Sequence, residues 1–387
     1  MEQTKKQRRE KGSGTVFQSS DGKWIARYKD ERFTKPKAFY GKSEAEVKKK
    51  LKEYKNEVSR KNPIVIKKQS VKTYMNSWLT KVKINEVKPR TYDDIENTLE
   101  NQVYPYLGDL QTTNINANDV QDMINSLTAK GLSYSRTKKA YDAVNACFKR
   151  GVIKGEVEKN PCLGVSLPRN RKKKQSDIIY FSKQKDIDSI CEVSALKYKS
   201  GRPVFRIGYI FIILLYTGMR ISELLGLKWT DIDIKNKTLT IRRTVVLTKN
   251  RDEDKEGKYL LLIQDSAKTE SSERIIPINK KAVKAIEELR KITGRFEFIV
   301  STSTGNIVDP SSIDRMFKDV LKRCGITPLC GVHALRHTFA SLLFKKGVEV
   351  KYVSELLGHS NVTVTYNTYI HLIKEQKHKM VSLLDNL

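Results

Sequence analysis

The stretch His333-Ala334-Leu335-Arg336-His337-Thr338-Phe339-Ala340 sets two histidines and one arginine among apolar residues. The apolar residues predict a buried helix that would hold the polar side chains in fixed positions. A histidine three residues before an arginine is, by itself, more often a structural pair than a catalytic site. Four of the chain's five histidines lie between His333 and His371, so this region is the first place to look for a functional site.

Three other motifs accompany this stretch. An arginine follows a Thr-Gly turn in Thr217-Gly218-Met219-Arg220-Ile221-Ser222-Glu223-Leu224. A lysine lies within Ala267-Lys268-Thr269, and Leu357-Gly358-His359-Ser360 leads to Tyr369-Ile370-His371. Each motif is weak alone, but their joint occurrence on one chain indicates a single site.

Taken in their order along the chain and with their separations, the motifs resemble those of the tyrosine recombinases, the integrase family of site-specific recombinases. The resemblance covers about residues 176 to 371. It implies two arginines that clamp the scissile phosphate, a lysine as general acid, two histidines that assist at the phosphate and a tyrosine that attacks it. On this sequence the corresponding residues are, in that order, Arg220 and Arg336, Lys268, His333 and His359, and Tyr369. The implied activity is cleavage and rejoining of DNA strands through a 3′-phosphotyrosyl intermediate, which integrates and excises a mobile element or prophage.

The chemistry of a phosphodiester supports these roles independently. Two guanidinium groups can neutralise and orient a phosphate as its charge grows toward a pentacoordinate state. A tyrosine hydroxyl, whose ordinary pKa is about 10, needs a neighbouring base, and we expect His333 to lie within hydrogen-bonding reach of it. Lys268, beside a turn between two strand-like runs, can protonate the departing 5′ oxygen, although an ordinary exposed lysine is the alternative. Because the intermediate is itself a phosphodiester, we expect no nucleotide cofactor and no metal.

Two tyrosines compete for the role of nucleophile. Tyr366 and Tyr369 follow His359 by seven and ten residues. We favour Tyr369, because Tyr369-Ile370-His371 resembles the ending of the family's motif and Tyr366 occupies a position that another residue type usually fills.

The composition favours a nucleic-acid partner. The chain of 387 residues has 74 Lys and Arg against 44 Asp and Glu, a net charge of +30, which repels itself without a polyanion. A basic ribosome-associated protein explains the charge equally well. The apolar run from Ile207 to Met219 is shorter than the roughly 20 residues of a membrane span and predicts a buried helix. With no signal peptide and five scattered cysteines, we expect a cytoplasmic protein. The resemblance implies that it acts in a bacterial host cell and is associated with the nucleoid when bound.

The pattern along the chain predicts a multidomain α+β protein. Residues 1–14 should be a basic tail, residues 15–60 a three-stranded sheet with one helix, and residues 64–165 a helical bundle. Residues 166–175 should be a basic linker, and residues 176–387 a mixed, mainly helical domain with a small antiparallel sheet and a C-terminal tail helix. The resemblance implies that the sheet is an arm-type DNA-binding module, the bundle a core-binding domain and the last segment the catalytic domain.

Basic side chains on three of these segments are candidates for DNA contacts. In the N-terminal sheet, alternation puts Trp24, Ala26 and Tyr28 on the face toward the helix and Arg27 and Lys29 on the other. The other candidates lie on the last helix of the bundle and in the linker: Arg136, Lys138, Lys139, Arg171 and Lys172. Solvated basic faces are the alternative for all of them.

The resemblance also implies partners. These are double-stranded DNA with attachment sites, a tetramer of the chain on that DNA, and accessory proteins that bend DNA and favour excision; no membrane partner is expected. Two other functions stay open. A recombinase that resolves chromosome or plasmid dimers would not need residues 15–60, and a non-enzymatic DNA-binding regulator would not need the full catalytic set.

Overall fold

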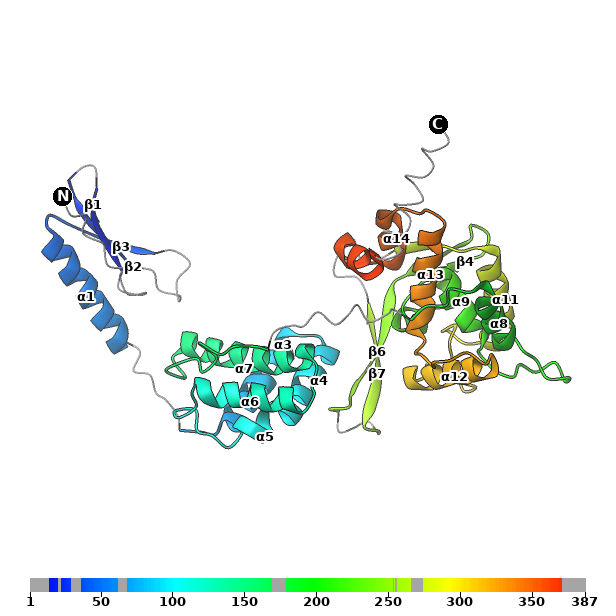
Figure 1. Ribbon diagram of the computed structural model, residues 1–387, viewed down its shortest axis with the longest axis horizontal. Helices are drawn as coiled ribbons and strands as arrows, with labels where there is room; N and C mark the ends of the chain where they lie inside the picture. Colours follow the sequence, from blue (N-terminus) through cyan, green and yellow to red (C-terminus); the bar gives the residue numbers. More distant parts are fainter. Residues whose placement is uncertain are drawn as a thin grey trace. The chain divides into compact units, whose positions relative to one another are not determined.

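The structure is a computed structural model that describes residues 14–19, 22–28, 36–61, 68–168, 179–252, 254, 256–265 and 274–370 (Figure 1). The chain divides into two compact units, Met1–Arg171 and Lys172–Leu387. Helices joined to small antiparallel sheets make up both units, which confirms the predicted multidomain α+β class. Several predicted features lie outside the described residues: nearly all of the basic tail, most of the linker, the C-terminal tail helix, and the candidates Lys29, Arg171, Lys172 and Lys268.

The first unit opens with a small sheet and one helix. Strands β1 (Thr15–Gln18), β2 (Trp24–Tyr28) and β3 (Lys37–Gly41) pair antiparallel in that order, and α1 (Glu44–Lys61) follows them. Ala26 is buried with residues of α1, and Trp24 and Tyr28 pack against the same cluster, as the alternation predicted. Arg27 is exposed on the opposite face.

The rest of the first unit is helical, as predicted. Its elements are α2 (Val71–Trp78), α3 (Ile84–Glu86), α4 (Pro89–Thr98), α5 (Tyr104–Leu107), α6 (Ala117–Ala129) and α7 (Tyr134–Lys154), with π-helical segments at Leu79–Lys83 and Leu99–Val103. Pro89 begins α4. A backbone N–H at this position has no partner within the helix, so the missing N–H of proline costs no hydrogen bond. The Ser133 side chain accepts from the backbone N–H of Arg136 at the start of α7, and Gly155 ends that helix in the left-handed conformation. Local sequence therefore sets the bounds of this long basic helix.

The second unit surrounds two small sheets with helices. Its helices are α8 (Gln184–Ser194), α9 (Tyr209–Thr217), α10 (Ile221–Leu225), α11 (Lys280–Thr293), α12 (Pro310–Arg323), α13 (His333–Lys345) and α14 (Val350–Leu357), and residues 362–370 are also helical. Strands β4 (Ile232–Asp233), β5 (Thr238–Ile241) and β8 (Arg274–Pro277) form one antiparallel sheet, and β6 (Arg243–Lys249) pairs with β7 (Tyr259–Asp265) in a hairpin. Among the described residues, no helix combines the length and apolar character needed to cross a membrane.

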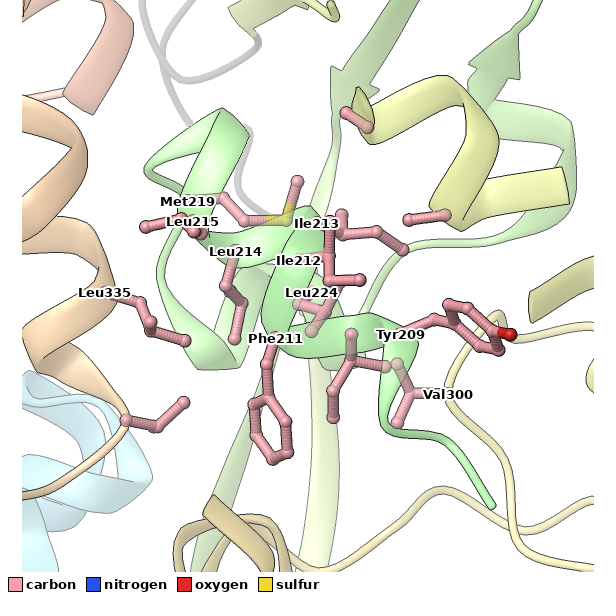
Figure 2. Packing of buried hydrophobic residues seen from close by; sticks show 14 of the residues in the cluster. Tyr209, Phe211, Ile212, Ile213, Leu214, Leu215, Met219, Leu224, Val300 and Leu335 are labelled. Atoms are coloured by element: carbon pink, nitrogen blue, oxygen red, sulfur yellow. The ribbon is translucent and has the colours of Figure 1, made fainter. Parts of the chain in front are cut away.

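Helix α9 lies at the centre of the second unit's core, which confirms the predicted buried helix. Its side chains from Tyr209 to Leu215 are all buried. Figure 2 labels Tyr209 and the side chains from Phe211 to Leu215, together with Leu224, Val300 and Leu335. Leu335 belongs to α13, which packs directly on α9. This packing brings the residue next to it, Arg336, to the Thr-Gly turn that ends α9.

Gly218 determines the shape of that turn. Its φ of +64° lies in the left-handed region that favours glycine, and a Cβ at this position would clash with the ring of Phe339 on α13. The backbone of the turn can therefore lie against α13. Two residues later, Arg220 occupies the cap position of α10.

Candidate active site

Arg336 is fixed where α9, α13 and α14 meet. Its side chain is buried, with the residue 3% exposed. Nη1 donates to the carbonyl of Gly218 at 2.8 Å, and Nη2 donates to the carbonyl of Leu357 at 2.8 Å. Burial lowers the pKa of Arg336 to about 10, and the nearby charge of Arg220 acts in the same direction. The guanidinium is therefore still a cation at neutral pH, held in one place.

His359 lies beside this guanidinium. Its Nε2 is 2.8 Å from Arg336 Nη2, and because a guanidinium only donates, Nε2 accepts this hydrogen bond. The ring proton of neutral His359 is then on Nδ1, which lies 2.6 Å from Oγ1 of Thr365. Burial lowers the pKa of His359 to about 4, and the Arg336 charge adds to that effect. His359 is thus a neutral, oriented ring at pH 7.

Arg220 presents a second guanidinium that is more open to solvent, with its side chain 38% exposed. Nη2 donates to the carbonyl of Gly358 at 3.1 Å, and Nη1 donates to Oε1 of Glu223 at 2.8 Å. Arg220 and Arg336 therefore bind neighbouring carbonyls at the end of α14. Two positive charges gathered in this way can bind an anion that arrives from solvent.

Two further charged residues belong to this cluster, although sequence reasoning gave them no role. Glu223 is 3% exposed and accepts from Nη1 and Nη2 of Arg274 at 2.9 and 2.7 Å. Burial raises the pKa of Glu223, but hydrogen bonds and charge from Arg274, then from Arg220, bring it down to about 2. Glu223 lies three residues after the arginine of the Thr-Gly-x-Arg motif, and this position was its one signal in the sequence. Arg274 had no signal among 74 basic residues.

Tyr369 is buried with residues of α13 and α14, and only 2% of it is exposed. Its hydroxyl oxygen is 2.8 Å from Nδ1 of His337, and its ring centroid is 5.3 Å from that of Phe344. Burial raises the pKa of the Tyr369 phenol, whereas the charge of Arg336 lowers it. Tyr366, the competing nucleophile, is 38% exposed. Of the two tyrosines, Tyr369 is the one that is hydrogen-bonded to a residue of the quoted histidine motif.

The expectation that His333 lies within hydrogen-bonding reach of Tyr369 is wrong in this structure. The hydroxyl's partner is His337, one helical turn further along α13. His333 is the exposed first residue of the helix, and its ring centroid is 4.7 Å from that of His337. Burial lowers the pKa of His337 to about 4, and the neighbouring His333 acts in the same direction. The signal for His337 was present as the second histidine of the quoted stretch, but spacing alone did not tell which ring meets the tyrosine.

The candidate DNA contacts lie apart from this site in the sequence. Arg136 and Lys139 are exposed on α7, and the partly exposed Lys138 is paired with Asp142 at 2.6 Å. Arg27 is exposed, and its guanidinium lies 5.2 Å from the centre of the Phe17 ring. These side chains are accessible to a polyanion.

Comparisons with known proteins cover most of the chain. Residues 183–376 match the phage integrase family, and residues 70–128 match the phage integrase N-terminal SAM-like domain. A tyrosine recombinase XerC-like protein of Caldanaerobacter subterraneus subsp. tengcongensis is 30% identical over 368 residues, which cover 91% of this chain and 92% of the relative. The ICEBs1 integrase of Bacillus subtilis is 25% identical over 368 residues, which cover 92% of each chain.

The fold is similar to that of a solved integrase. The Tn1549 transposon integrase in complex with transposon right end DNA superposes with a TM-score of 0.63 at 21% identity, over 81% of this chain and 100% of that chain. At this identity the likeness concerns the fold.

Proposed function

The chain belongs to the phage integrase family of tyrosine recombinases, and from this premise we propose how its residues perform site-specific integration. It is a tyrosine-type site-specific recombinase that cuts and rejoins DNA strands, and its substrate is the attachment-site DNA of a mobile element or prophage. One observation carries the proposal: Arg220, Arg336 and His359 meet at the end of α14, and Tyr369 bonds to the residue after Arg336.

Arg220 and Arg336 bind the scissile phosphate. Arg336 is held rigidly by two carbonyls, whereas Arg220 has solvent access through which DNA can approach. The phosphate gains negative charge on the way to the pentacoordinate state, so two cations already in position lower the barrier without moving. His333 at the start of α13 and His359 just after the end of α14 complete the group around the phosphate as hydrogen-bonding side chains.

Tyr369 is the nucleophile, and His337 is its proton partner. The phenol oxygen forms a bond to phosphorus while the bond from phosphorus to the 5′ oxygen breaks, which leaves a 3′-phosphotyrosine. The phenolic proton passes to Nδ1 of neutral His337, whose 2.8 Å contact supports this assignment. His337 replaces His333 in the role that the sequence suggested.

Lys268 protonates the departing 5′ oxygen. A lysine ammonium can give up a proton to a developing alkoxide, which is otherwise a poor leaving group. The segment that carries Lys268 leads into β8, whose first residue, Arg274, is bonded to Glu223 within the arginine cluster. A later attack by the 5′ hydroxyl of another strand reverses both transfers, so no nucleotide or metal is needed.

Double-stranded DNA is held by the remaining basic surfaces. We assign residues 15–60 as an arm-binding module, 64–165 as a core-binding domain, 166–175 as a linker and 176–387 as the catalytic domain. Their proposed phosphate contacts are Arg27, Lys29, Arg136, Lys138, Lys139, Arg171 and Lys172. Exchange between two duplexes requires four strand cuts, and since each chain supplies one Tyr369, we assign a tetramer on DNA, assisted by proteins that bend DNA.

The nucleophile is tested by trapping the covalent intermediate. The probe is a nicked duplex that carries the attachment-site core from the DNA flanking the gene, so that cleavage cannot be reversed. Wild type and Tyr366→Phe should form a protein–DNA adduct, and Tyr369→Phe should bind the duplex without forming one. Mass spectrometry after nuclease digestion should place the nucleotide on Tyr369. An adduct on Tyr366 would contradict the residue assignment, and an adduct on a serine would contradict the mechanism.

A further inference from the structure

Arg274 connects segments of the active site that are far apart in the sequence. Its Nη1 and Nη2 donate to the two carboxylate oxygens of Glu223 at 2.9 and 2.7 Å. Its Nε donates to the carbonyl of Leu356 in the last turn of α14 at 3.2 Å. The Arg274 side chain is only 15% exposed, so all of these contacts are made in a largely buried setting.

Three arginines bind three consecutive carbonyls at the C-terminal end of α14. The last carbonyls of a helix have no partner within it, and they carry the negative end of the helix dipole. Cations held there are therefore both hydrogen-bonded and electrostatically favoured. The pairs are Arg274 with Leu356, Arg336 with Leu357, and Arg220 with Gly358. The helix end thus sets the spacing of the three guanidinium groups.

Gly358 provides the space for this arrangement. Its φ is +66°, and a Cβ at this position would lie 2.7 Å from Nη1 of Arg274. Any other residue at position 358 would be strained and would push the guanidinium away. The glycine of the Leu-Gly-His motif is therefore explained by Arg274 as well as by its own backbone conformation.

The net charge of this cluster also depends on Arg274. Glu223 shares its single negative charge between Arg220 and Arg274. Arg220, Arg274 and Arg336 carry three positive charges against that one, which leaves a surplus of two for the phosphate. Without Arg274 the surplus is one. Among the described residues, the ion pair that Glu223 then keeps is the one with Arg220, so the carboxylate competes with the substrate for Arg220.

We propose that Arg274 is a positioning residue for strand cleavage, which neutralises Glu223 and thereby makes the Arg220 guanidinium available to the scissile phosphate. The same contacts fix the first residue of β8, into which the segment bearing Lys268 leads. This inference rests on the proposed function, because Arg274 acts through Arg220 and touches neither the substrate nor the nucleophile.

The chain offers a matched control in Arg243 on β6. Its Nη2 lies 2.9 Å from the buried carboxylate of Asp231, and Arg242 lies beside the same carboxylate at 3.3 Å. The Arg243 side chain is 12% exposed, close to the value for Arg274. Like Glu223, Asp231 is a buried acid between two arginines. This group of three residues does not contact the end of α14.

The test compares adduct formation on the nicked attachment-site duplex at saturating protein, together with duplex affinity and thermal unfolding. R274Q should form the adduct about 100-fold more slowly with unchanged affinity, since a small misplacement at a reacting group has effects of about that size. R274K, which keeps the charge but cannot bind both carboxylate oxygens, should lose roughly tenfold. E223Q/R274Q should recover part of the R274Q loss, because no carboxylate then competes for Arg220. R243Q should lower the unfolding temperature like R274Q and leave the cleavage rate of the folded protein near that of wild type.

Two outcomes would overturn the proposal: R274Q that cleaves as fast as R243Q, or E223Q/R274Q that is slower than R274Q. Either would give Arg274 a purely structural role. If R274Q does not fold, R274K decides in its place, and a wild-type cleavage rate for R274K contradicts the proposal. Failure of the proposed function is distinct, because wild type itself would then form no adduct.

Discussion

The arginine side of the active site and its tyrosine side hold their key groups by different means. On the arginine side, Arg220 and Arg336 are charged groups fixed by helix-end carbonyls and by the Glu223 carboxylate. On the tyrosine side, the hydroxyl of buried Tyr369 meets His337, a ring that burial keeps neutral at pH 7. Fixed charge is thus concentrated on the first side, while the second is built from uncharged rings.

This difference follows the order of events in the reaction. The phosphate arrives already charged, so its ligands work best when they are charged and placed beforehand. The nucleophile must lose a proton only when the phosphate is present, and burial that raises the Tyr369 pKa keeps it neutral until then. Variants on the two sides should therefore fail in different ways.

The largest effect is expected from Arg336→Ala, which removes the buried half of the arginine side. Loss of one preorganised group that stabilises charge in a transition state slows reactions by about 10²- to 10³-fold, and we expect at least that loss in adduct formation. Duplex affinity should fall little, because many other basic groups supply it. Rates on the nicked duplex and binding measured separately check this prediction.

Arg206→Ala is the matched control for Arg336→Ala. Arg206 also donates to two backbone carbonyls, those of Ser301 and Thr302, and its pKa is also lowered by burial. Both variants leave two carbonyls without their donor, so a similar loss of stability is expected from each. If Arg206→Ala abolished cleavage equally, the Arg336 effect would reflect folding and not its place at the phosphate.

A smaller effect, about 10²-fold, is expected from His337→Phe on the tyrosine side. Phenylalanine keeps a ring beside His333 and Tyr369 but removes the nitrogen that takes the proton, and general-base catalysis has effects of at least that size. His337→Asn restores a hydrogen-bonding atom without restoring a base. Single-turnover adduct formation across pH measures both variants.

The two His337 variants separate proton transfer from positioning. If His337 accepts the proton, both variants should be slow, and both should speed up as pH rises because hydroxide then competes as the base. If His337 only orients the phenol, His337→Asn should approach the wild-type rate. A wild-type rate for His337→Phe would remove His337 from the mechanism and return the role to another residue.

The arginine side could be predicted from sequence better than the tyrosine side. The motifs named Arg220, Arg336 and His359. The structure brings these three together because Arg220 and His359 each follow a turn with a left-handed glycine, and Arg336 lies next to buried Leu335 on α13. His337 was missed because two histidines one helical turn apart have the same spacing pattern. Which of them meets Tyr369 depends on the path of the chain from α14 through residues 362–370, which spacing does not encode.

Arg274 shows a second reason why sequence reasoning stopped short. Its partner Glu223 is 51 residues away, and the two meet only because β8 pairs with β5 next to the end of α14. The pairing of short strands was predicted only as a small antiparallel sheet, without register. An isolated arginine in a chain with 74 basic residues carries no mark of such a contact.

The smallest expected effect is a dependence of the free energy of unfolding on pH. His337 and His359 have pKa values lowered to about 4, so the folded chain keeps both neutral where the unfolded chain protonates them below about 6.5. These two rings therefore add no pH dependence above about pH 6.5, and they lower the stability of the folded chain as pH drops from 6.5 to 4. The carboxyl of Glu223, with its pKa lowered to about 2, should add a further loss only as pH falls from about 4.5 to 2.

Both rings are partly exposed, so solvent screening reduces the loss between pH 6.5 and 4 to about 1 to 3 kcal/mol for the pair. Urea unfolding measures it in a chain with Trp24 and Trp78 replaced by phenylalanine, where the fluorescence comes from Trp229, which is buried in the core of the second unit. His337→Phe should lose its share of the slope between pH 6.5 and 4, because one titrating ring is gone, and should keep the loss below pH 4.5 that belongs to Glu223. If His337→Phe kept the full wild-type slope of unfolding free energy between pH 6.5 and 4, His337 would not be held neutral beside Tyr369. The contrast between a charged side and an uncharged side would then not hold.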